Sequence, residues 1–320
     1  MDITKAIFET IDIAFNKKQN ESFVIEDSDK VVVEKDIQYS NSDPKNCFMD
    51  YFFIPKKRGK YPVIFNIHGG GFVAGKKEYR RQLCTWFATN GFFVVNVDYG
   101  LCPECKFPTP IVQLVDALNY ISDHAQQLRL NTSKIIVSGD SAGAYYACML
   151  AALCRNKKLQ VAFNVKPKAK FNAAILNCGL YDLEHTLNAR MILDINKKVF
   201  ESYTGINVED MQNFKLKDYC SPHSFITKSF PPTFLIYAKK DILCKGQEEF
   251  VINKLKKFNI YYESYNTKSF FRNHCFTLDW STKEAKEANG LLQNFILKFA
   301  NGSLPKHLSD AEFLIQAEEQ

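Results

Sequence analysis

The amino-acid sequence predicts an α/β fold with a mostly parallel central sheet, helices on both faces and a helical cap. Short apolar runs alternate with helix-like segments from residue 61 to residue 299, which is typical of strands buried between two helical layers. The alternation breaks between residues 182 and 230, a stretch too long for a simple crossover, so we expect an inserted segment there. A chain of 320 residues has room for one large α/β domain with such an insertion.

The first part of the chain is expected to contain one helix and two strands. Apolar residues recur every four positions along the first segment, as in an amphipathic helix, at Ile3, Ile7, Ile11 and Phe15. Residues 24–40 and 47–55 are rich in β-branched and aromatic side chains, so we expect them to form an antiparallel edge of the sheet.

The later apolar runs are expected to form the parallel strands of the sheet. These runs are residues 61–71, 91–99, 134–139, 168–179, 231–241 and 260–266. Helices are expected at residues 108–128, directly after Ser141, at residues 246–258 and at about residues 282–299. Within the inserted segment, residues 189–203 have a helical composition.

Charge and hydropathy argue against a nucleic-acid-binding protein and against a membrane-spanning protein. The formal net charge is +6, but the basic residues are scattered in pairs such as Lys76-Lys77, so we expect a solvated surface and no nucleic-acid partner. No window reaches the ~18 uninterrupted apolar residues of a membrane span. The N-terminal segment carries Glu9 and Asp12 where a secretory signal would be apolar. We therefore expect a cytoplasmic protein without a membrane span.

The ten cysteines do not predict a metal site or a disulfide framework. Most lie inside apolar segments, where a free cysteine behaves as a small hydrophobic residue. Cys102 and Cys105 have C-x-x-C spacing, but no second pair and no nearby histidine completes the four ligands of a zinc site. We expect neither a metal nor a cofactor.

A candidate nucleophile lies between a predicted strand and a predicted helix. Residues Gly139 to Gly143 read Gly-Asp-Ser-Ala-Gly and match G-x-S-x-G in the strand–turn–helix context that the motif requires. A β-carbon at Gly139 or Gly143 would collide with the neighbouring strand and helix. Ser141 would then project from the carboxyl end of the sheet, where the helix N-terminus favours developing negative charge.

A glycine-rich turn follows the first predicted parallel strand. Residues 68–72 read His-Gly-Gly-Gly-Phe, and glycines let backbone N–H groups approach a substrate closely. Together with the N–H of Ala142 they would form an oxyanion hole, in which a donor typically contributes ~3–4 kcal/mol. We interpret His68 as a residue that holds this loop through a hydrogen bond.

If the chain order is serine, acid, histidine, we expect the acid to follow Ser141 and the histidine to follow the last strand. Of the six histidines, His274 alone follows the last predicted strand by a short loop. Asp241 closes the preceding strand and would fix the tautomer of the imidazole. Asp279 is the alternative acid, but it lies only five residues past the histidine.

These motifs together resemble the hormone-sensitive-lipase-like serine esterases of the α/β-hydrolase fold. The matching stretches are HGGGF (68–72), DYGLCPECKFPTP (98–110), GDSAG (139–143), SPHSF (221–225), PPTFLIYAKKDIL (231–243) and HCF (274–276). They cover roughly residues 60–300 in the order of the family, and the combination is far more specific than any single motif.

The resemblance implies a site and a domain arrangement. The implied catalytic residues are Ser141 as nucleophile, Asp241 as acid and His274 as base. The implied oxyanion hole consists of the backbone N–H groups of Gly70, Gly71 and Ala142. Residues 1–45 and 182–228 would form the cap, while residues 46–181 and 229–320, the latter with a C-terminal tail, would form the core.

The sequence departs from the family pattern at three places. Gly100 replaces an arginine, Cys275 replaces a glycine, and Lys239-Lys240 stand where the family often has Gly-Glu. None of these changes removes a catalytic group, so they bear on substrate preference and efficiency.

The sequence thus predicts a serine carboxylesterase, similar to acetyl esterases, that acts on small or medium acyl esters through an acyl-enzyme. An amidase or formamidase would use the same machinery. A non-catalytic small-molecule receptor on the same fold is the third alternative, although such receptors typically lack a triad member. The expected partner is a small-molecule ester, and a homodimer is left open.

Overall fold

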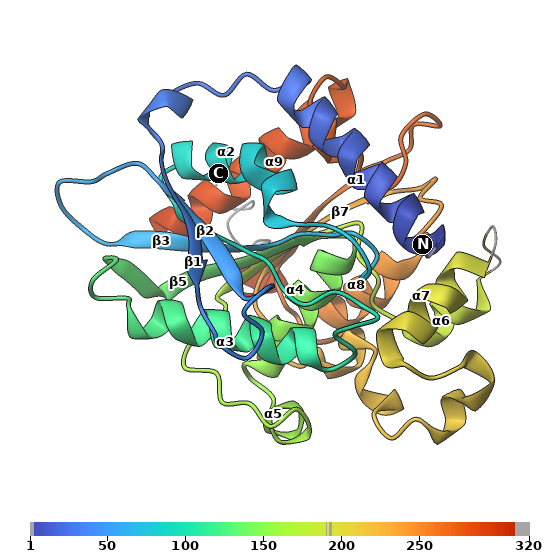
Figure 1. Ribbon diagram of the computed structural model, residues 1–320. Coiled ribbons are helices and arrows are strands. Elements are labelled where there is room, and N and C mark those ends of the chain that lie inside the picture. The colour runs from blue at the N-terminus through green and yellow to red at the C-terminus, as the bar shows by residue number, and fades with distance from the viewer. Residues whose placement is uncertain (1–2, 190, 192–193, 311–320) are drawn as a thin grey trace.

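A computed structural model describes residues 3–189, 191 and 194–310 of the chain (Figure 1). Within these residues, eight strands form one sheet in the order β1-β2-β4-β3-β5-β6-β7-β8. The strands are β1 (Val32–Gln38), β2 (Phe48–Phe53), β3 (Tyr61–Ile67), β4 (Phe93–Val97), β5 (Leu130–Asp140), β6 (Ala173–Asn177), β7 (Thr233–Ala238) and β8 (Tyr262–Thr267). The helices are α1 (Ile3–Ser22), α2 (Arg81–Thr89), α3 (Thr109–Asp123), α4 (Ala142–Leu153), α5 (Lys157–Ala162), α6 (Leu183–Asn188), α7 (Ile195–Thr204), α8 (Gln247–Lys257) and α9 (Lys283–Asn301).

The sheet is mostly parallel, as the sequence predicts. Strand β2 runs antiparallel to both of its neighbours, β1 and β4, whereas every pair from β4 to β8 in the sheet order is parallel. All side chains of β4 and β6 are buried, because helices cover both faces of the sheet. Each of the six predicted parallel runs overlaps one of these strands.

Two hydrophobic cores lie on opposite faces of the sheet. One core contains the apolar faces of α3, α4 and α8. The other contains α2 and α9, which lie above the sheet in the view of Figure 1. The carboxyl ends of the parallel strands therefore meet at one edge between the helical layers, where ligand sites of such folds form.

Two segments far apart in the sequence come together near this edge. Helix α1, drawn in blue, lies close to α7, drawn in yellow, and the two helices are in contact (Figure 1). Helices α6 and α7 belong to the segment that breaks the strand–helix rhythm. The division of the chain into cap and core at residues 45, 182 and 228 stays a prediction.

Two expectations about local structure were wrong in part. Residues 24–31 do not extend the first strand, because Asp27 adopts a left-handed conformation (φ 60°) that starts a 3-10 turn at Ser28–Lys30. The burial stripe of α1 also differs from the predicted one: Ile7, Ile11 and Phe15 are half-buried. The most buried side chains of the helix are Thr4, Phe8, Asp12 and Gln19.

Some of the predicted features lie outside the described residues. The helical stretch 189–203 is described from Ile195 onward as α7, but residues 190, 192 and 193 lie outside the description. The C-terminal tail beyond residue 310 also lies outside it.

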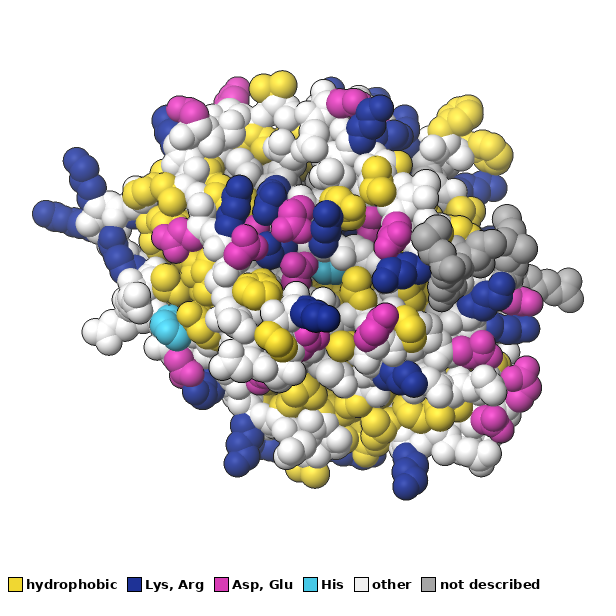
Figure 2. All heavy atoms as spheres, in the orientation of Figure 1, with side chains coloured by type: hydrophobic (Ala, Val, Ile, Leu, Met, Phe, Trp, Pro, Cys, Tyr) yellow, Lys and Arg dark blue, Asp and Glu magenta, His cyan; other side chains and the backbone are white. Residues whose placement is uncertain are grey.

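The surface agrees with the predicted scatter of charges. On the face drawn in Figure 2, basic and acidic side chains are interspersed, without a continuous basic patch. No helix in the described part of the chain is both long enough and apolar enough to cross a membrane.

Two glycine-to-alanine substitutions should have opposite effects on stability. A β-carbon at Gly143 would lie 2.1 Å from the Ile67 carbonyl oxygen, so Gly143→Ala should lower the free energy of unfolding by about 1–3 kcal/mol. Gly290 lies within α9, and among the described residues no atom outside the backbone of its own helix lies within 4 Å of an added β-carbon. Gly290→Ala should therefore raise the free energy of unfolding by about 0.5–1 kcal/mol. Urea unfolding of both variants measures the difference, and a Gly143→Ala variant as stable as wild type would contradict the tight packing.

Candidate active site

The strand-to-helix turn between β5 and α4 holds Ser141 in a strained conformation. Ser141 has φ 52° and ψ −121°, in a region that L-residues rarely occupy. The predicted steric reason for the glycines is confirmed, since a β-carbon on Gly139 would lie 2.3 Å from the carbonyl carbon of Gly143. The Ser141 amide donates to the carbonyl of Asn177 at 2.9 Å, which fixes the turn against β6.

His274 and Asp241 form a buried pair in the loops that follow β8 and β7. The Nδ1 atom of His274 lies 2.9 Å from Oδ2 and 3.1 Å from Oδ1 of Asp241. Oδ1 also accepts from the backbone N–H groups of Leu243 and Cys244, each at 2.8 Å, which orients the carboxylate. The alternative acid, Asp279, instead accepts hydrogen bonds from Lys18 and Ser281. The structure therefore brings Asp241 to the histidine.

Asp241 and His274 shift each other's pKa in opposite directions. Burial alone would raise the pKa of Asp241, but the charge and hydrogen bond of His274 and the two backbone N–H groups outweigh it, so the pKa lies below its usual value. Burial alone would lower the pKa of His274, but the carboxylate of Asp241 outweighs it with the help of Asp140 and Asp12, so the pKa lies above its ordinary value.

Ser141 and His274 line the same small cavity, which Gly70 also lines. Its volume is about 10 Å³. The Nε2 atom of His274 is buried and has no hydrogen-bond partner among the described residues, so the Ser141 hydroxyl does not reach it here. Hydrogen bonds between a nucleophile and its base are often long in ligand-free structures and tighten when the substrate binds.

The glycine turn after β3 lies against this cavity and requires its glycines. Gly70 and Gly71 have φ 125° and 59°. A β-carbon on Gly70 would lie 2.0 Å from the carbonyl oxygen of Ala74, and one on Gly71 would lie 2.5 Å from the ring of Phe8. The predicted hydrogen bond of His68 is present, since its Nδ1 atom lies 2.7 Å from the carbonyl oxygen of Gly69.

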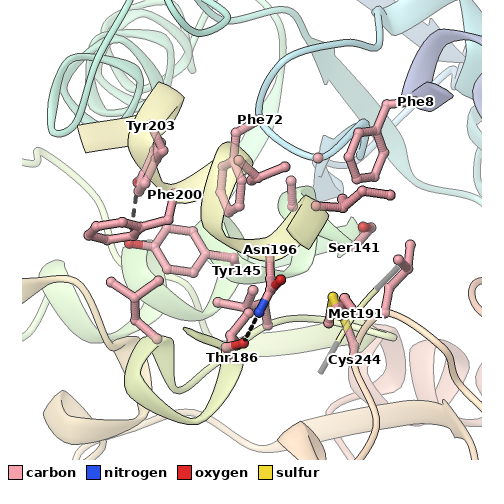
Figure 3. Close-up of a pocket in the computed structure, with 17 residues that line it drawn as sticks. Phe8, Phe72, Ser141, Tyr145, Thr186, Met191, Asn196, Phe200, Tyr203 and Cys244 are labelled. Carbon is pink, nitrogen blue, oxygen red and sulfur yellow. Dashed lines mark hydrogen bonds between the residues drawn. The ribbon is translucent and has the colours of Figure 1, made fainter. Parts of the chain in front are cut away.

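A second cavity, of about 60 Å³, extends from Ser141 between α1, α4 and α7 (Figure 3). Its walls are largely apolar and aromatic. Tyr145, Phe200 and Tyr203 lie at the end away from Ser141 in Figure 3. The hydroxyl of Tyr203 donates to that of Tyr145 at 3.2 Å, and the latter donates to the carbonyl of Cys220 at 2.9 Å. These bonds satisfy the phenols and leave an apolar lining.

A wider cavity of about 590 Å³ lies beside this pocket and shares part of its lining, including Leu243 and Ile195. Lys239 and Lys240, which depart from the family pattern, line this wider cavity together with Asp241. The departure therefore lies next to Asp241, at the carboxyl edge of the sheet.

A buried ion cluster below Ser141 was missed by the sequence analysis. Arg80, which is 1% exposed, donates twice to the carboxylate of Asp140, from Nε and Nη2 at 2.7 Å each. Its Nη2 also donates to Oδ1 of Asp12 at 3.0 Å. The cluster joins α1 to the turn that carries the serine. The sequence offered one signal for this cluster, which is the acidic residue Asp12 next to the apolar stripe of α1.

The other departures from the family pattern have local explanations. A β-carbon at position 100 would lie 2.3 Å from Sγ of Cys105, so only glycine fits beside that thiol. Cys275 is buried with φ 49°, a conformation that favours glycine. It packs with Cys178 and Leu278 behind the histidine.

Within the part of the chain that the structure describes, two clusters of side chains contain possible metal ligands. They are Cys178, His274 and Cys275, and Asp241, Cys244 and His274, each with its ligand atoms within 4.8 Å of one another. Burial raises the pKa of the Cys244 and Cys275 thiols, which keeps them protonated, and thiols bind metals as thiolates. All ten cysteines are free thiols, and every one except Cys105 is buried.

Comparison with known proteins gives one family match and several relatives. The BD-FAE family model matches residues 49–254. Acetyl esterases of Salmonella schwarzengrund and Salmonella dublin are 27% and 28% identical to the chain over 186 residues, which are 57% of this chain. The aligned part spans only 55%, about half, of the length of these relatives.

Several solved structures share this fold at low sequence identity. Esterase B from Lactobacillus rhamnosis superposes with a TM-score of 0.80 at 19% identity, covering 93% of this chain and 94% of the other. A bacterial heroin esterase superposes with a TM-score of 0.72 at 23% identity, covering 92% and 90%. A hyperthermophilic esterase from Pyrobaculum calidifontis gives 0.69 at 22% identity, covering 94% and 93%. At these identities the likeness establishes a shared fold.

Removal of the Asp241 charge should lower the pKa of His274. Asp241→Asn takes away the largest influence that raises this pKa, while the burial that lowers it remains. An NMR titration of the His274 ring measures the pKa directly, with Asp279→Asn as the matched control. An unchanged pKa in Asp241→Asn would contradict the coupling of the pair.

Disruption of the ion cluster should destabilise the protein strongly. Arg80→Met leaves the buried carboxylates of Asp140 and Asp12 without their cation, so the free energy of unfolding should fall by about 3–5 kcal/mol. Lys168→Met, which breaks a pair with Asp123 whose side chains are half-exposed, should cost less than about 1 kcal/mol. Equal losses in urea unfolding of the two variants would argue against a special role for the cluster.

Proposed function

The chain belongs to the BD-FAE family, α/β-hydrolases similar to hormone-sensitive lipase, and from this membership we propose that it is a serine carboxylesterase. The family and the fold agree with the resemblance that the sequence predicts. In this proposal Ser141 is the nucleophile, His274 the base and Asp241 the acid. The observation that carries the proposal is that Ser141 and His274 line one cavity while Asp241 holds the other nitrogen of the imidazole.

The proposed acylation step uses these groups in sequence. Oγ of Ser141 attacks the acyl carbon of the ester, and Nε2 of His274 accepts the hydroxyl proton. Asp241 keeps its hydrogen bond from Nδ1 and stabilises the imidazolium that forms. The tetrahedral oxyanion is held by backbone N–H groups of Gly70, Gly71 and Ala142. The alcohol then leaves with the proton from His274, and the acyl group stays on the serine.

The second half of the cycle returns the enzyme to its starting state. Water attacks the acyl carbon while His274 accepts its proton, and the carboxylic acid leaves as Ser141 recovers its hydrogen. The cycle requires no redox step, so it needs no cofactor in the proposal.

The proposed substrates are small or medium acyl esters. The apolar and aromatic lining of the pocket beside Ser141 suits the hydrocarbon part of an acyl group. The relatives named acetyl esterases support a short acyl group. We assign the cover of this pocket to α1 and to the segment 182–228, because Phe8, Ile195 and Phe200 line it.

Hydrolysis of p-nitrophenyl esters from acetate to laurate tests the proposal. Wild type should hydrolyse the short esters best, with kcat/KM falling as the acyl chain lengthens. Ser141→Ala should lose activity by roughly 10⁴-fold or more, because the acyl-enzyme cannot form. Ser133→Ala, at an exposed position on β5, is the control and should keep wild-type activity.

Other outcomes of the same experiment would contradict the proposal. Retained turnover in Ser141→Ala would exclude this serine as the nucleophile. Faster turnover of matched amides than of esters would favour an amidase or formamidase. If a folded wild-type protein hydrolyses none of the esters, a small-molecule receptor would be favoured. Ligands of such a receptor would be found by their ability to raise the Tm.

A further inference from the structure

We propose that Asp12 of α1 positions the water that hydrolyses the acyl-enzyme. The inference rests on the proposed function, since it concerns the second half of that reaction. It assigns a role to a residue outside the serine, histidine and acid of the proposed triad. Two buried polar atoms without a hydrogen-bond partner among the described residues, Oδ2 of Asp12 and Nε2 of His274, belong to residues that line the same cavity.

Asp12 is a buried carboxylate that uses only one of its oxygen atoms within the protein. The side chain is 3% exposed. Its Oδ1 atom accepts from Arg80, whereas Oδ2 has no hydrogen-bond partner among the described residues. A buried carboxylate oxygen without a partner is costly, so this atom is suited to bind a hydrogen-bond donor that enters the cavity.

The second unpartnered atom is Nε2 of His274, the atom that must accept the proton of the attacking water. Nδ1 is bound to Asp241, so in the neutral imidazole Nδ1 carries the hydrogen and Nε2 is an acceptor. Asp12 and His274 line the same cavity as Ser141 and Gly70. Asp12 also contributes to the raised pKa of His274, which indicates that the two groups interact.

The size of the cavity suits a single water molecule. Its volume is about 10 Å³, close to the smallest space that holds one water. A water there can donate one hydrogen to Oδ2 of Asp12 and the other to Nε2 of His274. Its lone pairs are then free to face the acyl carbon on Ser141, so both acceptors orient the nucleophile at once.

The hydrolytic step balances with these groups. The water oxygen forms a bond to the acyl carbon, and one of its protons moves to Nε2 of His274. The tetrahedral intermediate then breaks its bond to Oγ of Ser141, which takes the proton back from Nε2. Asp12 accepts the second hydrogen of the water throughout, and this hydrogen leaves as the hydroxyl of the carboxylic acid.

This role separates Asp12 from the acylation step. The leaving alcohol carries a carbon substituent where water carries its second hydrogen, so it offers nothing for Asp12 to accept. We therefore expect Asp12 to accelerate deacylation and to favour water over alcohols as the acyl acceptor. If Asp12 served only as an anchor for α1 through Arg80, it would affect both steps alike.

The test is pre-steady-state kinetics of Asp12→Asn with p-nitrophenyl acetate. The amide oxygen can still accept from Arg80, but the amide nitrogen cannot accept from water. The burst of one p-nitrophenol per active site should keep its rate within about 2-fold, while steady-state turnover falls by about 10-fold or more. With methanol added, the ratio of methyl acetate to acetate should rise relative to wild type.

Glu9→Gln is the matched control, because it makes the same change on the same helix at a residue that does not line this cavity. It should leave burst, turnover and methanol partition unchanged. If Asp12→Asn does not fold, Asp12→Glu replaces it. The longer side chain keeps its charge beside Arg80 and fills the cavity, so it should again slow turnover more than the burst.

Three outcomes would overturn the inference. If a folded Asp12→Asn variant keeps the wild-type turnover and the wild-type ratio of methyl acetate to acetate, Asp12 has no role in the reaction. A parallel loss of burst and turnover, with a lower Tm, would make it an anchor for α1. A wild-type protein that forms no acyl-enzyme would refute the proposed function itself, whereas the first two outcomes would leave that function intact.

Discussion

The buried ion cluster of Arg80, Asp140 and Asp12 is the interaction on which the rest of the site depends. One guanidinium contacts the turn that carries Ser141 and the helix that begins the chain, through hydrogen bonds of 2.7–3.0 Å. A buried arginine cannot shed its charge, so it needs both carboxylates near it. The positions of Ser141 and of α1 are therefore linked, and the apolar pocket beside Ser141 is lined by residues of both α1 and α4, such as Phe8 and Tyr145.

Much of the fold and part of the site could be predicted from the sequence because the relevant signals are local. The run of residues before Gly139 is apolar and the next residues are small, which identifies a strand, a turn and a helix without tertiary information. Asp241 and His274 were identifiable because each follows a strand, and parallel strands end at one edge of the sheet. Their expected proximity appears in the structure as the 2.9 Å contact between them.

The features that escaped prediction are those in which tertiary contacts override the local pattern. Asp12 and Arg80 are charged, and charged residues are buried only when paired with partners that the sequence alone cannot identify. The same cause displaced the buried stripe of α1 from the isoleucines to a face that includes Asp12 and Gln19. Residues 24–31 failed as a strand because a left-handed Asp27 starts a turn, which composition does not reveal.

The position of α1 at the start of the chain has a consequence for how the small cavity forms. Asp12 of α1 lies near one end of the sequence, His274 lies near the other, and Ser141 lies between them. All three residues line the same small cavity. This cavity is therefore complete only when segments from both ends of the chain have packed against the turn that carries Ser141.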